Sequence, residues 1–387
     1  MRVRIWTRIV PGVALGVAVL TLAGCKGFWN EPASSSTTTT TKTSGHVYVL
    51  NAGANAIAGY YVNAGTLTAL SGSPYSVPAT PLALAVAPDN DFLYVSTVSG
   101  IYVYTIASTG ALTISNSSTA ITSDPATSMA ISSGSNWLVE AVSGSASVFA
   151  LAVNPTTGLL RSTAEQSQTL PASTIQQVTM APDDSYAIVS MGTGGTALIP
   201  FTTGNTNPFG AVTTIGTVNS SGSALSAAVD PSARVLYIGE TAATSGTNSG
   251  GIRVFNLSTL VEQSGSPYAS GGLAPYWILP EAGGSYVYAV NRQTSSGSTG
   301  VLNGFTLSQS SNVYKLNAMS STFTAGTHPV AAVEDNTAQF VFVVNYGGSY
   351  DLMGYVFDSS TAGALDEVVY SSTGTDPVYA NAIAAAH

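Results

Sequence analysis

The chain has 387 residues, with 10 Lys and Arg against 19 Asp and Glu, 3 His and a net charge of −9. So few basic residues exclude the positive surface that nucleic-acid binding needs, and a single Cys excludes an internal disulfide and a cysteine metal cage. Hydrophobic residues make up 45% of the chain, enough for a large core, which excludes disorder throughout.

The first 25 residues have the pattern of a bacterial lipoprotein signal. Three Arg precede an apolar stretch at 9–22, which is short for a membrane span but typical of a secretory signal. Leu22-Ala23-Gly24-Cys25 then resembles the lipobox, a motif whose Cys is lipidated and becomes the mature N-terminus. The alternative is an ordinary signal peptide with an incidental Cys.

Lipidation of Cys25 would anchor an exported protein to the cell envelope. Because Lys26 rather than Asp follows, we expect the outer membrane, on its periplasmic or surface face. Cleavage would leave seven Lys and Arg against 19 Asp and Glu, a net charge of −12. Residues 26–45 contain an unbroken Ser/Thr run at 34–41 that cannot bury enough apolar surface to fold. We therefore predict a flexible tether at 26–45 and a folded domain at 46–387.

The folded part repeats. One unit has apolar segments at 82–86, 92–95, 101–106 and 112–115, separated by residues typical of turns. A period near 49 residues with four short strands predicts an all-β, seven-bladed β-propeller with four antiparallel strands per blade. A β-sandwich or a solenoid is the alternative. The second segment recurs seven times, as Val47-Tyr48-Val49, Leu93-Tyr94-Val95, Trp137-Leu138-Val139, Tyr186-Ala187-Ile188, Leu236-Tyr237-Ile238, Val287-Tyr288-Ala289 and Val341-Phe342-Val343.

The two ends of the repeat region predict how the ring closes. The first unit begins at its second strand, whereas residues 380–386 form an extra innermost strand at the other end. We expect this C-terminal strand to pair beside residues 47–51 and complete the first blade, which leaves only short, protected edges. A solenoid would not need one strand missing and one spare.

The strand sequence Phe342-Val343-Val344-Asn345-Tyr346-Gly347-Gly348 resembles the Tyr-Val-Thr-Asn-type (YVTN) repeats of the lactonase-type seven-bladed propellers. The recurring order of inner strand, Pro-Asp turn and Leu-Tyr-Val strand is similar as well. This family includes 6-phosphogluconolactonase-like proteins and bacterial surface lipoproteins. The resemblance covers residues 46–387 and implies the propeller fold, with a ligand site at one mouth of the central channel.

The resemblance also implies that the protein could be a lactone hydrolase. Active relatives carry a Gly-Pro-Arg-His stretch and a later Glu; this chain keeps the Glu, as Glu240, but has residues 221–225 without cations at the first place. Lactone opening needs a base and a donor for the carbonyl oxygen, and Glu240 with Arg292 or His328 could supply both. Each also has a structural explanation: Glu240 could pair with a nearby Arg, Arg292 could be solvated, and His328 could be a turn residue.

A non-catalytic binding or scaffold module on the cell envelope is the function favoured by the sequence, because the phosphate-binding cations are mostly missing and the chain is acidic. Its ligand would be a small molecule, glycan or peptide at the propeller mouth. No phosphate-binding loop or calcium-loop pattern is present, so we expect no cofactor, no metal and a monomer. The predicted ligand-binding residues are Tyr276, Tyr346, Tyr379, Asp124 and Asp376.

Overall fold

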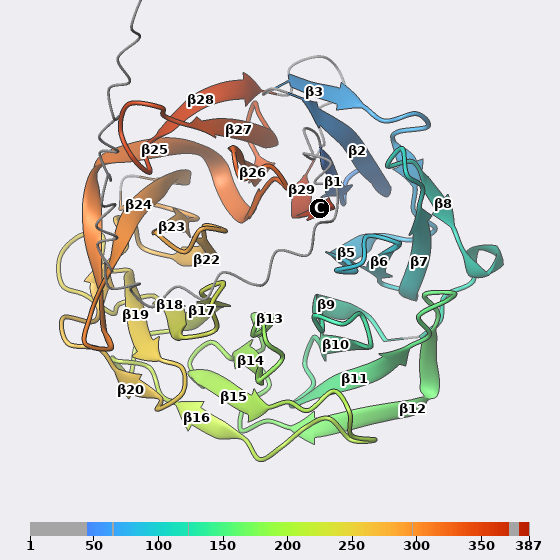
Figure 1. Ribbon diagram of the computed structural model, residues 1–387, viewed down its shortest axis with the longest axis horizontal. Helices are drawn as coiled ribbons and strands as arrows, with labels where there is room; N and C mark the ends of the chain where they lie inside the picture. Colours follow the sequence, from blue (N-terminus) through green and yellow to red (C-terminus); the bar gives the residue numbers. More distant parts are fainter. Residues whose placement is uncertain (1–44, 64–65, 123, 296, 371–378, 387) are drawn as a thin grey trace, which may run out of the picture. The chain divides into compact units, whose positions relative to one another are not determined.

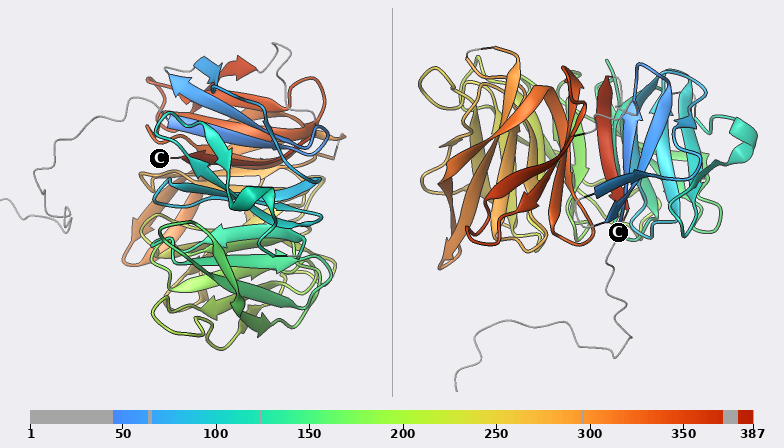
Figure 2. Two further views of the ribbon diagram at one scale, coloured as in Figure 1. Left: turned by 90° about the vertical axis from the view of Figure 1, so that its right-hand side faces the viewer. Right: turned by 90° about the horizontal axis from the view of Figure 1, so that it is seen from above.

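The computed structural model describes residues 45–386, except 64–65, 123, 296 and 371–378 (Figure 1). The predicted signal sequence, the lipidation site Cys25, nearly all of the predicted tether and Asp376 lie outside the described residues. The described residues belong to one compact unit, in which antiparallel sheets surround a central axis (Figures 1 and 2). None of them forms a helix long and apolar enough to cross a membrane.

Blades 1 to 4 are separate antiparallel sheets, whose strands follow one another from the centre of the ring to its rim. Blade 1 comprises β29 (Ala380–Ala386), β1 (Gly45–Asn51), β2 (Ala56–Asn63) and β3 (Thr66–Ala69), with β4 (Tyr75–Ser76) also on β2. Blade 2 comprises β5 (Pro81–Val86), β6 (Phe92–Thr97), β7 (Gly100–Ile106) and β8 (Leu112–Ile114), followed by the 3-10 turn η1 (Asn116–Ser118). Blade 3 comprises β9 (Ala126–Ile131), β10 (Trp137–Val142), β11 (Ser147–Val153) and β12 (Leu160–Thr169). Blade 4 comprises β13 (Gln177–Met180), β14 (Tyr186–Ser190), β15 (Thr196–Pro200) and β16 (Thr213–Ile215).

Blades 5 to 7 follow the same order, but blades 6 and 7 share a strand. Blade 5 comprises β17 (Ala224–Val229), β18 (Val235–Glu240), β19 (Gly251–Asn256) and β20 (Val261–Glu262), with β21 (Tyr268–Ala269) also on β19. Blade 6 comprises β22 (Pro275–Pro280), β23 (Tyr286–Asn291), β24 (Thr299–Ser310) and the first part of β25 (Val313–Glu334). Blade 7 comprises the last part of β25, β26 (Phe340–Gly347), β27 (Leu352–Phe357) and β28 (Leu365–Tyr370).

The shared strand β25 departs from the prediction of separate four-stranded sheets. Its first part pairs with β24 as the rim of blade 6, and its last part pairs with β26 as the innermost strand of blade 7. Thr327 lies at the crossover and pairs with both Thr299 and Gly347. The chain therefore passes from rim to centre without a loop that interrupts the ladder, and two blades join into one seven-stranded sheet.

The ring closes as the sequence predicted. The C-terminal strand β29 pairs antiparallel with β1, from His46 opposite Ala386 to Asn51 opposite Ala380. Because β1 also pairs with β2 on its other side, both of its edges are hydrogen-bonded. Blade 1 therefore combines strands from the two ends of the folded part. The agreement covers the fold class, the seven blades and the closure.

Seven clusters of buried apolar side chains hold the blades together, and each cluster joins two neighbouring blades. One residue near the centre of each second strand packs on the following blade; in chain order these are Tyr48, Tyr94, Val139, Ile188, Tyr237, Tyr288 and Phe342. The predicted alignment of the seven copies is wrong by one residue in blades 3 and 4. Leu138 and Ala187 occupy this place in it, but both face the preceding blade.

Three of the tyrosines at this position also connect neighbouring blades by hydrogen bonds. The hydroxyls of Tyr48, Tyr94 and Tyr288 each donate to a glycine carbonyl in the following blade, at 2.7, 2.8 and 2.7 Å. Those glycines, residues 110, 158 and 363, have φ values of 80°, 67° and 75° in tight turns that an L side chain would strain. The recurring tyrosine is therefore a structural residue rather than a site residue.

Candidate functional site

The innermost strands of all seven blades enclose a central cavity of about 290 Å³. Strands β5, β9, β13, β17, β22, β25 and β29 each contribute to its wall, and Figure 1 shows them around the axis. Small apolar side chains such as Ala83, Ala331 and Ala382 line much of it, because seven strands that converge on one axis leave little room for larger groups. The cavity is of a size that holds one small ligand.

One positively charged side chain lies at this cavity. Among the described residues that line it, Arg292 carries the only formal charge. Arg292 directly follows β23, where its backbone N–H donates to the carbonyl of Ala274 at 2.8 Å, and its guanidinium carbon lies 4.8 Å from the centre of the Tyr276 ring on β22. The ring holds the guanidinium by a cation–π contact and leaves its N–H groups to serve a ligand.

The remaining polar lining consists of amides, hydroxyls and aromatic rings, with Thr127 and Ser128 supplying hydroxyls. Gln177 accepts a hydrogen bond from the backbone of Ala227 at 2.8 Å, which fixes its amide between β13 and β17. Asn381 on β29 donates to the carbonyls of Pro81 and Leu82 at 3.2 and 3.3 Å, and its buried Oδ1 has no partner among the described residues. These hydrogen bonds hold both amides in the cavity wall.

Aromatic residues occur at the same cavity. Tyr276, Trp277 and Tyr346 all belong to its lining. The rings of Tyr346 and Tyr379 lie 5.4 Å apart, and both side chains are well exposed. Of the predicted ligand-binding residues, the structure therefore places Tyr276 and Tyr346 at the cavity, with the ring of Tyr379 in tilted contact with that of Tyr346. Asp124 lies elsewhere, beside Glu140 and Glu165.

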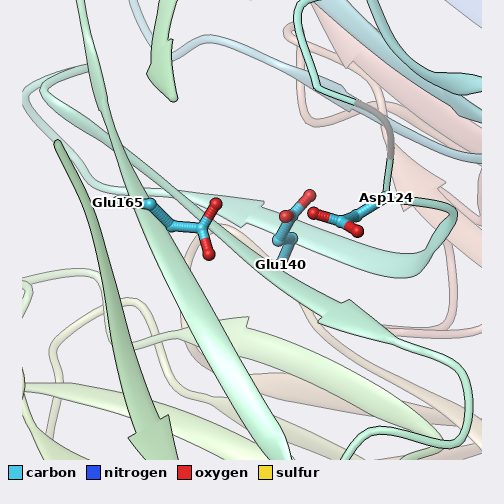
Figure 3. A group of neighbouring side chains, drawn as sticks. All are labelled: Asp124, Glu140 and Glu165. Carbon is cyan, nitrogen blue, oxygen red and sulfur yellow. The ribbon is translucent and has the colours of Figure 1, made fainter. Parts of the chain in front are cut away.

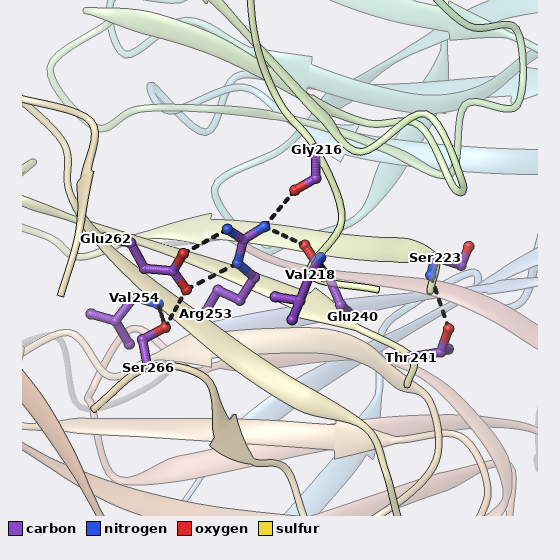
Figure 4. Close-up of polar contacts among 9 residues, drawn as sticks. All are labelled: Gly216, Val218, Ser223, Glu240, Thr241, Arg253, Val254, Glu262 and Ser266. Atoms are coloured by element: carbon purple, nitrogen blue, oxygen red, sulfur yellow. Dashed lines mark hydrogen bonds and ion pairs between the residues drawn. The ribbon is translucent and has the colours of Figure 1, made fainter. Parts of the chain in front are cut away.

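Glu240 belongs to a buried ion-pair network in blade 5 that is centred on Arg253 (Figure 4). It ends β18, is 1% exposed, and accepts hydrogen bonds from Arg253 at 2.9 Å and from the backbone of Val218 at 2.9 Å. Arg253 also donates to the carbonyl of Gly216 at 2.6 Å and to both oxygens of Glu262 at 3.0 and 2.6 Å. Burial lowers the pKa of Arg253, but the hydrogen bonds that it donates to Glu262 and Glu240, with the charges of both, outweigh burial and raise the pKa.

Glu240, Arg292 and His328 are not joined by any hydrogen bond or ion pair among the described residues, and of the three only Arg292 lines the cavity. His328 lies within β25 at the crossover between blades 6 and 7, with a φ of 50° and its backbone N–H donating to Ser298. The pairing of Glu240 with a nearby Arg, one of the sequence interpretations, is present in the structure. The catalytic roles of these three residues stay predictions.

Sequence reasoning did not select several residues of the cavity wall. Trp277, Gln177 and Asn381 lie on innermost strands, and Gln176 comes just before one. Only Asn381 carried a clear signal, since it is the one polar residue in the segment Ala380–Ala386, which is otherwise Ala and Ile.

A closed ring of seven antiparallel blades around one ligand-sized central cavity makes this protein a seven-bladed β-propeller. The model of the family described as Lactonase, 7-bladed beta-propeller matches residues 40–176 and 235–386, and the chain belongs to that family. No curated protein matches the sequence.

Solved structures share the fold at low sequence identity. A candidate 6-phosphogluconolactonase of Bacteroides fragilis NCTC 9343 is 13% identical over 90% of this chain and 99% of its own, with a TM-score of 0.68. One of Bacteroides uniformis ATCC 8492 is 13% identical over 89% and 100%, with a TM-score of 0.70. The periplasmic gluconolactonase of Pseudomonas aeruginosa is 16% identical over 89% and 99%, with a TM-score of 0.67.

Proposed function

We propose that this protein binds a small sugar lactone in the central cavity and hydrolyses it, with Arg292 holding the lactone carbonyl oxygen. The observation that carries the proposal is the guanidinium of Arg292, the one charged group among the described residues at a cavity otherwise lined by amides, hydroxyls, aromatic rings and apolar side chains. Membership of the lactonase family and the fold shared with a gluconolactonase support the reaction class.

Arg292 can supply the charge stabilisation that lactone hydrolysis needs. Water adds to the carbonyl carbon, the ring C–O bond breaks, the leaving oxygen takes a proton, and the product is a hydroxy acid that ionises to a carboxylate. Arg292 would stabilise the negative oxygen of the tetrahedral intermediate and then the carboxylate. The rings of Trp277 and Tyr346 would cover the apolar face of the sugar.

The charge of the site favours a neutral lactone over a phosphorylated one. A single guanidinium balances one negative charge, and the whole chain carries −9. A dianionic phosphate would therefore be repelled by the protein as it approaches. Once bound, one of its two negative charges would have no positive partner.

The second candidate function is a non-catalytic module that binds the open-chain sugar acid. One observation favours it: the described residues of the cavity wall include no carboxylate or imidazole that could act as a general base.

The experiment measures acid release from δ-gluconolactone and its 6-phosphate by the full chain, beside Arg292→Gln and the matched control Arg234→Gln. Arg234 is an exposed arginine on the turn between β17 and β18. We expect turnover of the neutral lactone above the spontaneous rate, a loss of about 10²–10³-fold in Arg292→Gln, and no change in Arg234→Gln. Spontaneous rates throughout, with gluconate binding that only Arg292→Gln abolishes, would replace the hydrolase by the binding module.

Glu240→Gln belongs in the same assay. If Glu240 is the general base predicted from the sequence, this variant loses turnover while it still folds. If Glu240 instead serves only to pair with Arg253, the variant keeps its kcat and is less stable than the unmodified chain.

We also propose that the protein is exported and held on the bacterial envelope by a lipid at Cys25, with residues 26–45 as the tether. The motif Leu22-Ala23-Gly24-Cys25 supports this. Metabolic labelling with a radioactive fatty acid should mark the full chain and not its Cys25→Ser variant; equal labelling of both would reject the anchor.

A further inference from the structure

Blade 3 carries a buried glutamate where the other blades carry an apolar residue. In each second strand, the residue after the one that packs on the following blade faces the preceding blade. Six of these residues are buried and apolar: Val49, Val95, Val189, Ile238, Ala289 and Val343. The seventh is Glu140, which is 0% exposed. Its neighbour two residues earlier, Leu138, packs into the interface between blades 2 and 3, and side chains two apart share a face of a strand.

Glu140 lacks the partners that a buried carboxylate needs. Both of its carboxylate oxygens are inaccessible, and neither accepts a hydrogen bond from the described residues. Burial, and then the charges of Asp124 and Glu165, raise the pKa of Glu140 to about 8. A carboxylate in such a place is costly unless something pairs with it, so its presence in an interface that is apolar in six other blades requires an explanation.

Two further carboxylates converge on Glu140 (Figure 3). Asp124 comes from the loop before β9, Glu140 from β10 and Glu165 from β12, and one carboxylate oxygen of each lies within 4.8 Å of the others. No ion pair neutralises any of the three within the described part of the chain. Burial and the charge of Asp124 also raise the pKa of Glu165.

More oxygen atoms without partners belong to the same interface. Thr122, two residues before Asp124, has a buried hydroxyl with no hydrogen bond, and so does Ser96 on β6. Ser96 is two residues after Tyr94 and therefore faces blade 3, as Tyr94 does. Ile121 donates its backbone N–H to Ile101, the residue that pairs with Ser96, so these hydroxyls lie at one end of the interface.

We propose that Asp124, Glu140 and Glu165 form a binding site for one Ca²⁺ ion between blades 2 and 3. Carboxylate and hydroxyl oxygens are the ligands of hard divalent cations, and an ion among these three would remove both the repulsion and the missing partners of Glu140. This site is independent of the proposed function, because none of its three residues lines the central cavity. The expectation of no metal, drawn from the sequence, would then be wrong.

The origin of the ligands favours Ca²⁺ over Mg²⁺. The three carboxylate oxygens lie within 4.8 Å of one another and come from three separate segments of the chain. Such a set suits the flexible geometry of Ca²⁺ better than the strict octahedron of Mg²⁺.

The experiment titrates CaCl₂ and MgCl₂ into the EDTA-treated full chain by calorimetry and measures Tm with and without each cation. The test variant is Glu140→Val, which gives blade 3 the residue type of the other blades and should therefore fold. The matched control is Glu367→Gln, which removes an exposed carboxylate on β28.

We expect one Ca²⁺ per chain with a Kd of about 10⁻³ M or tighter, a Tm that rises by a few degrees at saturating Ca²⁺, and a much weaker response to Mg²⁺. Glu367→Gln should behave as the unmodified chain. Glu140→Val should lose the Ca²⁺ response and, without cation, melt above the unmodified chain. No Ca²⁺ response in the unmodified chain, a response retained in Glu140→Val, or equal affinity for Mg²⁺ would overturn the proposal.

Discussion

Replacement of Arg253 by Met should destabilise the protein strongly, because Arg253 is the group that compensates the buried charge of Glu240. The guanidinium reaches Glu240 at 2.9 Å, Gly216 at 2.6 Å and Glu262 at 2.6 Å from one position (Figure 4). Without it, the carboxyl of Glu240 is left at 1% exposure with only the N–H of Val218 beside it. Breaking such a pair from one side costs about 3–5 kcal/mol.

The double variant tests that reasoning. In Glu240→Gln/Arg253→Met the buried charge is gone and Gln can still accept the Val218 N–H, so most of the loss should be recovered. We expect a coupling energy of at least about 1.5 kcal/mol in a double-mutant cycle measured by urea unfolding. A cost below about 1 kcal/mol for Arg253→Met, or no recovery in the double variant, would refute the assignment of Glu240 as a structural anion.

The ion pair between Arg253 and Glu262 should also make the stability of the protein depend on pH. Burial raises the pKa of Glu262, but the hydrogen bonds from Arg253 and Ser266 outweigh it and hold the pKa below its usual 4.5. A carboxyl whose pKa is lower in the folded state stabilises the protein above 4.5 and loses that contribution as the pH falls through the lowered value. As the pH falls from 5 through the lowered pKa of Glu262, the free energy of unfolding should therefore decrease less in Arg253→Met than in the unmodified chain.

Two other predictions concern Glu334 and the ring closure. Burial, together with the charges of Glu281 and Asp335, raises the pKa of Glu334 to about 7 against the hydrogen bond from Ala282, so stability should fall by about 3 kcal/mol as the pH rises from 4.5 to 7. Glu334→Gln should remove that part of the slope in urea unfolding; an unchanged slope would contradict it. Ending the chain at Tyr379 removes β29 and uncovers the ladder of β1, so gel filtration should show aggregates; a monomer with an unchanged Tm would disprove closure by β29.

The central cavity was predictable in place but not in composition. A propeller places its ligand site on the axis, and Arg292, Tyr276 and Tyr346 were selected from loops and strands expected near one mouth. Gln177 and Asn381 were missed because the inner strands were judged by their small residues. Glu240 was singled out through the family motif, whereas its contacts with Arg253 and Val218 depend on how β18 lies beside β19 and the segment before β17.

By itself, the sequence determined the fold class, the number of blades, the strands of the unit at 81–115 and the closure by residues 380–386. Strand and turn propensities act locally, and repetition averages out the errors of any one unit. Tertiary structure alone decided the face that each second strand presents. Both faces of each second strand are buried between blades, so an alternation of polar and apolar residues does not distinguish them. The predicted alignment of the seven copies was therefore wrong by one residue at Leu138 and Ala187. It also decided the meeting of Asp124, Glu140 and Glu165, because residues 16 and 25 positions apart come together only when the strands of blade 3 pair.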